Sequence, residues 1–247
     1  MRVALFGGTF DPVHRGHLAV ARTAADAFGL SLVYFAPADI PPHKQKRKLT
    51  DFQHRYAMLA LATAEDKRFV PSLLDSYTGQ PNYSIDSVRR QKKTLNKSDK
   101  LYFLIGIDAF KDISTWRMPE ELLAECDFII ANRPGHSMAD VVRSLPKDLR
   151  PSETYLRNMK KAQRNGSLVI PGATLHLLTD VHERVSSTQI RAAAAKSAKQ
   201  LARYVPQLVA EYIRKEGLYR PGARTTEATP APKVLSFHGD PSGAVKR

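Results

Sequence analysis

The sequence predicts an α/β fold in which flanking helices cover a doubly wound parallel sheet and a helical segment follows at the C-terminal end. A short apolar run at residues 3–6 is typical of a strand that is buried on both faces. A helical pattern at 17–28 and a second apolar run at 31–36 follow it. A strand, a helix and a strand in this space form a βαβ unit, which predicts a parallel sheet with right-handed crossovers. At 247 residues, the chain is long enough for one such domain with a sizeable core.

The later elements continue this alternation, as in a Rossmann-like domain. Strands are expected at 68–74, 101–107, 127–131 and 174–181, and helices at 51–65, 84–95, 118–125, 189–203 and from Pro206 onward. Pro71 places its strand toward a sheet edge, because proline cannot donate to a strand ladder. In the helix at 51–65 we expect His54 and Arg55 at the surface, and an orientation of Arg55 toward the site stays open.

Two segments carry little of this pattern. Residues 136–172 alternate helical patches with proline and charge, and we expect an insertion or a subunit contact there. Residues 221–247 are rich in Pro, Gly, Ala, Thr and Ser, which is typical of a disordered tail. We therefore expect one domain over residues 1–220, followed by a tail without a role in the chemistry.

The composition excludes several classes of protein. The single cysteine, Cys126, excludes an internal disulfide framework and a CxxC redox or zinc motif, and its apolar neighbours predict an inert buried thiol. No apolar stretch approaches the ~20 residues that a membrane span needs. The chain starts directly with a strand and not with a signal peptide, so we expect a cytoplasmic protein without a membrane partner.

The net charge of +14 has two interpretations. It can serve nucleic-acid binding, or it can form a basic surface that attracts phosphorylated substrates. The charge is scattered over 44–48, 89–93 and 160–164, without interleaved aromatic residues. This distribution favours attraction of phosphorylated substrates, and we expect no nucleic-acid partner.

The first strand predicts a phosphate-binding turn. It ends at Gly7-Gly8 and leads into a helix near His17, so backbone N–H groups and the helix dipole can attract an anion there. His14 and His17 fall where that phosphate would lie. A purely structural turn with surface histidines is the alternative, and neither the GxGxxG nor the Walker spacing is present.

These residues resemble a known signature. GGTFDP at residues 7–12, followed by HRGH at 14–17, resembles the nucleotidyltransferase superfamily that carries an HxGH motif. In that superfamily the histidines contact the α-phosphate of a nucleoside triphosphate. The superfamily leaves the acceptor open among nicotinate or nicotinamide mononucleotide, phosphopantetheine, flavin mononucleotide, and glycerol or choline phosphates.

Two later segments narrow the acceptor. The stretch PADIPPHK at 37–44, with Lys44 as a mobile charge suited to a phosphate, resembles nicotinate and nicotinamide mononucleotide adenylyltransferases in particular. An exposed basic loop is the alternative. The segment NYSIDS resembles the SYTxxT element of the bacterial nicotinate enzymes, which lies by the pyridine carboxylate. Asn82, Ser84 and Ser87 replace its serine and two threonines, which leaves the preference for acid or amide open.

Polar residues also follow two other strands. Asp108 matches the family's ribose contact in a G-x-D element, with an N-cap role as the alternative. In the family a tryptophan at the position of Trp116 stacks on the pyridine ring, whereas a core position is the usual reading of a tryptophan. Arg133, in a stretch ANRPG that also resembles the family, is a candidate phosphate clamp or a structural ion pair.

A second anion cradle is predicted at residues 185–191. Three hydroxyl residues precede a helix, and Arg191 follows one turn later on the same face. The stretch VSSTQIR resembles the ISSTxIR element that grips the triphosphate in this family. The pattern at 205–219 resembles the family's closing VPxxVxxYIxxxxLY segment.

The resemblance covers about residues 1–220 and implies a bacterial-type nicotinate mononucleotide adenylyltransferase of NAD biosynthesis. ATP and nicotinate mononucleotide would give nicotinate adenine dinucleotide and pyrophosphate, with Mg²⁺ carried by the ATP phosphates and no metal site of the protein's own. It implies catalytic roles for His14, His17, Lys44 and Arg191. It implies ATP binding by Gly7, Gly8, Thr9, Phe10, His17, Gly106, Asp108, Ser186, Ser187, Thr188 and Arg191. It implies mononucleotide binding by Lys44, Asn82, Tyr83, Ser84, Trp116 and Arg133.

Two alternatives remain at this point. One is another HxGH transferase, with nicotinamide mononucleotide or phosphopantetheine as acceptor. The other is a non-catalytic basic protein that binds nucleotides or RNA, motivated by the charge of +14. A homo-oligomer is compatible with either.

Overall fold

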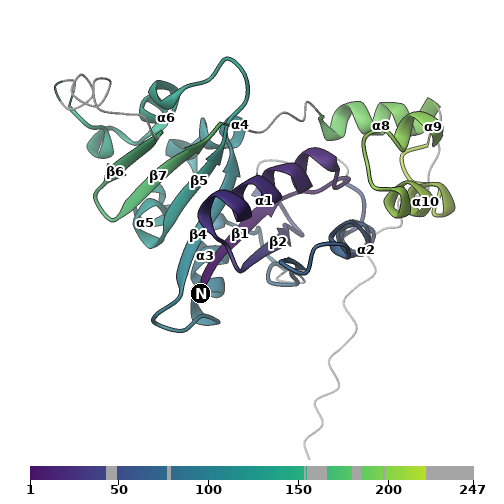
Figure 1. Cartoon of the computed structure of the whole chain (residues 1–247), viewed down its shortest axis with the longest axis horizontal. Helices are drawn as coiled ribbons and strands as arrows, with labels where there is room; N and C mark the ends of the chain where they lie inside the picture. Colours follow the sequence, from purple (N-terminus) through teal and green to yellow (C-terminus); the bar gives the residue numbers. More distant parts are fainter. Residues whose placement is uncertain are drawn as a thin grey trace, which may run out of the picture.

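Seven strands form one sheet among the residues that the computed structural model describes, which are 1–42, 49–76, 79–152, 154, 166–179, 185–196 and 198–220 (Figure 1). In spatial order they are β3 (Phe69–Pro71), β2 (Leu32–Pro37), β1 (Arg2–Gly8), β4 (Lys100–Gly106), β5 (Asp127–Ala131), β7 (Ala173–Leu178) and β6 (Ser167–Ile170). All neighbouring pairs are parallel except β6 with β7. The order runs outward from β1 in both directions, so the predicted doubly wound fold is confirmed.

Helices cover both faces of this sheet. They are α1 (Arg15–Phe28), α2 (Phe52–Thr63), α3 (Ser84–Lys93), α4 (Ile107–Phe110), α5 (Pro119–Glu125), α6 (Met138–Ser144), α8 (Ser187–Lys196), α9 (Ala198–Leu201) and α10 (Gln207–Lys215). Ala4 and Phe6 of β1 pack into a core with α1, α2 and α10. Val3 and Leu5 point the other way, into a core with α3, α5 and α6. This alternation explains why the whole strand is apolar.

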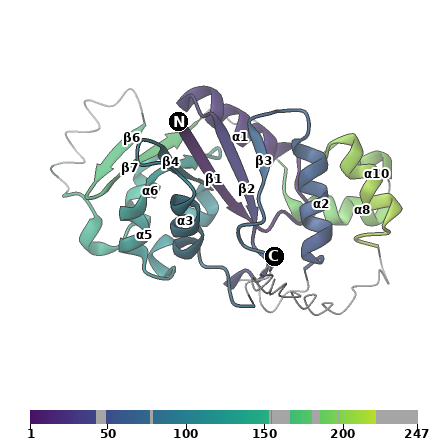
Figure 2. The same ribbon diagram turned by 90° about the horizontal axis from the view of Figure 1, so that it is seen from below.

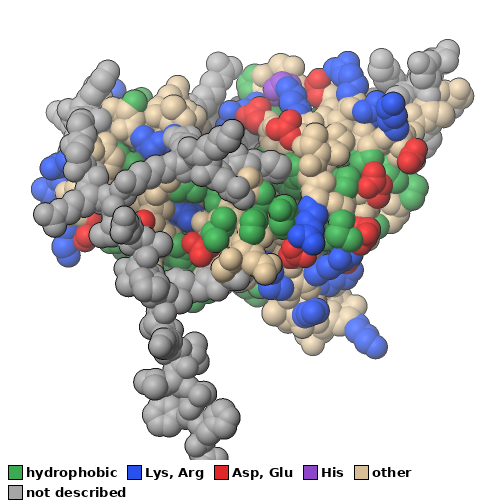
Figure 3. Space-filling model, turned by 180° about the vertical axis from the view of Figure 1, so that it is seen from behind, with side chains coloured by type: hydrophobic (Ala, Val, Ile, Leu, Met, Phe, Trp, Pro, Cys, Tyr) green, Lys and Arg blue, Asp and Glu red, His purple; other side chains and the backbone are tan. Residues whose placement is uncertain are grey.

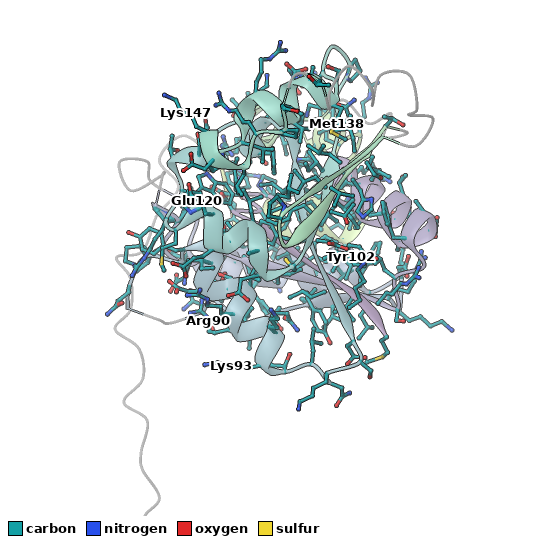
Figure 4. The ribbon with its side chains drawn as sticks, turned by 90° about the vertical axis from the view of Figure 1, so that its left-hand side faces the viewer. Arg90, Lys93, Tyr102, Glu120, Met138 and Lys147 are labelled. Carbon is teal, nitrogen blue, oxygen red and sulfur yellow. The ribbon has the colours of Figure 1, made fainter. Side chains whose placement is uncertain are left out.

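The helices meet in two groups. The C-terminal helices α8–α10 lie at one end of the molecule, where α10 packs beside α2 (Figures 1 and 2). On the opposite face of the sheet α3 lies beside α5, where Figure 4 labels Arg90 of α3 and Glu120 of α5. The Arg89 side chain of α3 bonds to Glu121 at 2.6 Å and to Glu125 at 2.8 Å. The Arg15 amide donates to the Tyr204 carbonyl at 2.9 Å, which ties the start of α1 to the C-terminal helices. No described helix is both long enough and apolar enough to cross a membrane.

The structure corrects the predicted elements in a few places. The strand β6 lies within 136–172, where no strand was expected. It has only four residues and Val169 is exposed, so its pattern in the sequence is too short to predict a strand. The helix α8 begins at Ser187, two residues before the predicted start. The strand β3 lies at the sheet edge, as predicted, but it ends at Pro71 and is shorter than the expected 68–74. The predicted tail at 221–247 lies outside the described residues.

Candidate active site

A cavity of about 910 Å³ lies at the carboxyl ends of the central parallel strands. Its walls include Gly8 at the end of β1, Ala36 of β2, Gly106 at the end of β4 and Ala131 at the end of β5. Ligands of doubly wound sheets bind beyond this edge, and the volume suits a small molecule. The cavity therefore lies where the sequence predicts the ligand site.

The first loop brings its glycines to this cavity. Gly7, Gly8 and Thr9 line it directly. A Cβ atom on Gly8 would lie 3.0 Å from the Phe10 ring, so a larger residue would displace that ring. Phe10 is 2% exposed, and its ring centroid lies 5.0 Å from that of His17. The Phe10 side chain therefore packs behind His17 in the core and supports that imidazole. Its predicted contact with ATP stays a prediction.

The two histidines form a reciprocal cap at the start of α1. The backbone N–H of His17 donates to Nδ1 of His14 at 3.3 Å, and the backbone N–H of His14 donates to Nδ1 of His17 at 3.2 Å. The rings stack with centroids 3.6 Å apart, and both residues line the cavity. This arrangement is a capping box in which imidazoles replace the usual hydroxyl and carboxylate.

The cap fixes the tautomer of both imidazoles. Since each Nδ1 accepts a hydrogen bond, a neutral ring carries its proton on Nε2. Burial, and then the positive charge of Arg133, lowers the pKa of His14 from 6.5 to about 4. His14 is therefore a neutral donor at physiological pH, which suits a phosphate oxygen without requiring proton transfer.

We expect His14 to stay neutral, with its proton on Nε2, down to about pH 5. Correlation spectra of the ring nitrogens, assigned with a His14→Asn variant, measure both the tautomer and the titration. Because the unfolded chain takes up this proton first, the contribution of His14 to stability should be complete above its ordinary pKa of 6.5. It should fall as the pH drops toward about 4. A titration near pH 6.5, or a proton on Nδ1, would contradict this assignment.

The second predicted cradle lies against the first loop. Ser186, at the start of α8, lines the cavity, while the Ser187 hydroxyl donates to the Pro12 carbonyl at 3.3 Å. The Arg191 guanidinium donates to the Asp11 carbonyl at 2.5 Å and to the Thr188 hydroxyl at 3.0 Å. Two segments about 175 residues apart thus meet, as the phosphate interpretation requires. Ser187, Thr188 and Arg191 are behind the cavity wall, and their contacts with ATP stay predictions.

The rim opposite carries an ion pair. Asp108 and Arg133 line the cavity, and their side chains are joined at 2.8 Å. Gly106 is the N-cap of α4, so Asp108 has no capping role there and its carboxylate faces the rim. Both side chains are more than half exposed, at 53% and 59%, which leaves them accessible to a ligand.

The remaining wall is aromatic. Trp116, Tyr83 and Ser84 line the cavity, and Trp116 is half-buried against the core under α3 and α5. The Arg117 guanidinium lies 4.8 Å above the Tyr83 ring. The predicted mononucleotide residues of this wall are thus brought together. Lys44, predicted for the same substrate, lies outside the described residues.

A buried carboxylate that the sequence interpretation missed organises the segment after β3. Asp75 is 4% exposed and accepts the Ser87 hydroxyl at 2.8 and 2.7 Å and the Arg90 guanidinium at 2.5 Å. The Asn82 side chain donates to the Asp75 carbonyl at 3.0 Å and accepts from the Ile40 amide at 2.8 Å. Ser87 and Asn82 therefore hold the wall together. Among the described residues, no cluster of His, Cys, Asp or Glu is arranged to hold a metal ion.

Comparison with known proteins places this geometry in a family. The family described as cytidylyltransferase-like matches residues 5–193. The chain belongs to this family. A "probable nicotinate-nucleotide adenylyltransferase" of Moorella thermoacetica is 37% identical over 221 residues, which cover 89% of this chain and 92% of the relative. A protein of the same name from Thermoanaerobacter sp. is 35% identical over 220 residues, covering 89% and 95%.

Solved structures show the same fold. The Plasmodium falciparum nicotinic acid mononucleotide adenylyltransferase complexed with NaAD superposes with a TM-score of 0.67 at 20% identity. The match covers 88% of this chain and 97% of that chain. The cytidylyltransferase-like fold is therefore shared beyond the range of close sequence similarity.

Ser87 and Ser84 should behave differently in this cytidylyltransferase-like chain. Ser87→Ala removes the hydroxyl that bonds Asp75, so we expect it to lower the free energy of unfolding by about 1.5–3 kcal/mol. It should leave the mononucleotide KM nearly unchanged, since that hydroxyl is already engaged. Ser84→Ala should raise that KM with little loss of stability. Thermal melting and steady-state kinetics on both variants check this pair, and the reverse pattern would contradict it.

The expected surface position of Arg55 was wrong, because this residue is 1% exposed. The helical period contained the signal, because Phe52, Leu59 and Ala62 are buried on the same side of α2. His54, the other residue expected at the surface, is partly buried, and its Nδ1 lies 2.8 Å from the Tyr212 hydroxyl.

Proposed function

We propose that the chain is a nicotinate-nucleotide adenylyltransferase that joins ATP and nicotinate mononucleotide to give nicotinate adenine dinucleotide and pyrophosphate in NAD biosynthesis. The observation that carries the proposal is the reciprocal cap of His14 and His17 at a helix N-terminus inside the cavity, with Ser186 on another wall. The relatives' names support the same substrates. MgATP is the nucleotide substrate, so the cation arrives with the phosphates.

The chemistry is a direct in-line displacement without a covalent enzyme intermediate. A phosphate oxygen of the mononucleotide attacks the α-phosphorus of ATP, and the bond to the bridging oxygen breaks as pyrophosphate leaves. The Nε2–H groups of His14 and His17, at the positive end of the α1 dipole, donate to the oxygens where charge develops. Arg191 and Lys44 are proposed to stabilise the leaving pyrophosphate and the attacking phosphate. The enzyme's task is positioning and charge stabilisation.

The two substrates would meet at the rim where Asp108 and Arg133 form their ion pair. We propose that Asp108 accepts hydrogen bonds from the ATP ribose. Trp116 would stack on the pyridine ring, while Tyr83, Ser84 and Arg133 bind the rest of the mononucleotide. Asn82 supports this wall from behind through its bonds to Asp75 and Ile40.

One observation favours a competing acceptor, nicotinamide mononucleotide. Asp75 and Ser87 both line the cavity, and the Ser87 hydroxyl donates to the Asp75 carboxylate, which is also paired with Arg90 at 2.5 Å. The Ser87 hydroxyl proton is therefore already engaged and is not available for a pyridine carboxylate, which can only accept. The acid and the amide must therefore be tested side by side.

The test is pyrophosphate release from MgATP with four acceptors in parallel: nicotinate mononucleotide, nicotinamide mononucleotide, phosphopantetheine and none. We expect the highest kcat/KM with nicotinate mononucleotide. A higher value with the amide would revise the acceptor, and turnover only with phosphopantetheine would overturn the substrate. No turnover with any acceptor, together with salt-sensitive RNA binding, would favour a binding protein.

The surface charge does not favour the RNA-binding alternative. On the face shown in Figure 3, Lys and Arg side chains are interspersed with Asp and Glu and do not form one basic patch.

A further inference from the structure

Arg55 is a buried cation in the first turn of α2, with Phe52 before it and Leu59 after it on the same helical face. Its guanidinium donates to four backbone carbonyls. Nε reaches Thr50 at 2.8 Å, one terminal nitrogen reaches Thr9 at 2.9 Å and Ala38 at 2.8 Å, and the other reaches Asp39 at 3.3 Å. These four bonds all go to the main chain of two loops, one between β1 and α1 and one between β2 and α2.

Three of the four carbonyls lie just past the two strands whose ends form neighbouring walls of the cavity. Thr9 directly follows β1, and Ala38 and Asp39 directly follow β2. Thr9 and Ala38 line the cavity. Between the walls, the Ala38 amide donates to the Gly8 carbonyl at 2.9 Å. One terminal nitrogen of Arg55 therefore bridges the loop beside the histidines to the loop after β2.

The carboxylates of Asp11 and Asp39 offset the positive charge of Arg55. Asp11, in the same loop as Thr9, is 4% exposed; its carboxylate accepts the Tyr219 hydroxyl at 2.7 Å and the Thr50 amide at 3.5 Å. Burial lowers the pKa of Arg55, and the charges of Asp11 and Asp39 raise it again. Burial and the neighbouring Asp11 charge raise the pKa of Tyr219, so that phenol stays a donor.

Burying a charged side chain in a core carries a desolvation penalty. An apolar side chain of similar volume is often neutral or stabilising at such a site. What arginine supplies is geometry, because its planar fork holds several acceptors at fixed positions. The observation that all four acceptors lie in loops at the carboxyl edge of the sheet connects that geometry to the cavity.

We propose that Arg55 is a positioning residue for the transfer reaction. It sets the distance between the β1 wall, where the histidines act on ATP, and the β2 wall, on the mononucleotide side. This inference rests on the proposed function, because it concerns the alignment of two substrates. In an in-line displacement, a misplacement of about 1 Å can cost 100-fold in rate. Arg55 would therefore affect kcat more than the affinity for either substrate.

The test compares Arg55→Met, Arg55→Lys and Arg55→Ala in the full chain. Met keeps the volume without the fork, and Lys keeps the charge without the fork. We expect kcat to fall about 10- to 100-fold in Met and Ala and less in Lys, with both KM values within about threefold. In Arg55→Ala, millimolar guanidinium should restore part of kcat, since it can occupy the vacated fork. Arg22→Ala, an exposed arginine of α1, is the matched control and should behave as wild type.

A readout that does not need turnover separates this inference from the proposed function. Hydrogen exchange at the Ala38 amide, which bonds to Gly8, should speed up in Arg55→Met but not in Arg22→Ala. Unchanged kcat and exchange in Arg55→Met would overturn the inference. So would a loss of kcat that simply follows a loss of melting temperature in every variant, without any rescue by guanidinium. Faster exchange in a protein that turns over no acceptor would refute the proposed function while leaving the link between the walls in place.

Discussion

His17→Ala is expected to lower kcat about 10²- to 10³-fold, because it removes a fixed donor at the phosphate where charge develops. The imidazole is held from two sides, by its Nδ1 bond to the His14 amide and by the Phe10 ring behind it. Such a donor needs no reorganisation during the reaction. Steady-state kinetics with MgATP and nicotinate mononucleotide measure the loss, and the KM for ATP should change much less than kcat.

The control for this variant is His17→Gln. A glutamine at the third helical position can still accept the His14 amide, as in a usual capping box. We therefore expect Gln to retain the melting temperature that Ala loses, while kcat stays far below wild type. If His17→Ala kept near-normal kcat, the role of the paired imidazoles would be refuted. If Gln restored both properties, the residue would be needed only as a helix cap.

Trp116→Ala should raise the KM for the pyridine mononucleotide and leave the KM for ATP nearly unchanged. Stacking of a heterocycle on an aromatic side chain contributes about 1–3 kcal/mol, so we expect an increase of about 5- to 150-fold. The half-buried position of Trp116 on the cavity wall leaves part of its ring for such a contact. Initial rates with each substrate varied in turn measure the effect.

Trp116→Phe is the matched variant for this experiment. It retains an aromatic face on the same wall and should recover most of the affinity. An equal increase of both KM values in Trp116→Ala would indicate that the wall has collapsed, and no increase would place the pyridine ring elsewhere. Only the second result would move the mononucleotide away from this part of the cavity; the first would mean that Trp116 is needed for the structure of the wall.

The fold was predictable because most of its helices and strands bury apolar side chains at regular intervals along the sequence. The apolar strand at Val3–Phe6 packs against both cores, and that requirement is visible in the sequence. The strand β6 escaped prediction because its pairing with β7 is a tertiary contact at a sheet edge, where Val169 stays exposed. The buried face of β6 consists of only Leu168 and Ile170, which is too short an alternation to predict a strand.

The candidate site was predictable only where a motif of particular side-chain types marks it. The motifs at His14–His17 and Ser186–Arg191 were found because their chemistry depends on particular side chains. Arg55 was missed because its partners are backbone carbonyls, which every residue type carries. Its four acceptors also come from two separate loops, and no spacing in the sequence predicts that they converge.

The loop that precedes the histidines has a consequence for synthesis of the chain. The carbonyl of Pro12 is bonded by Ser187, that of Asp11 by Arg191, and the Asp11 carboxylate by Tyr219. These partners follow the loop by 175, 180 and 208 residues. A ribosome releases the loop first and its partners last, so a nascent chain can build most of the sheet while the phosphate end of the cavity is still incomplete. Catalytic competence therefore waits for the last helices to emerge.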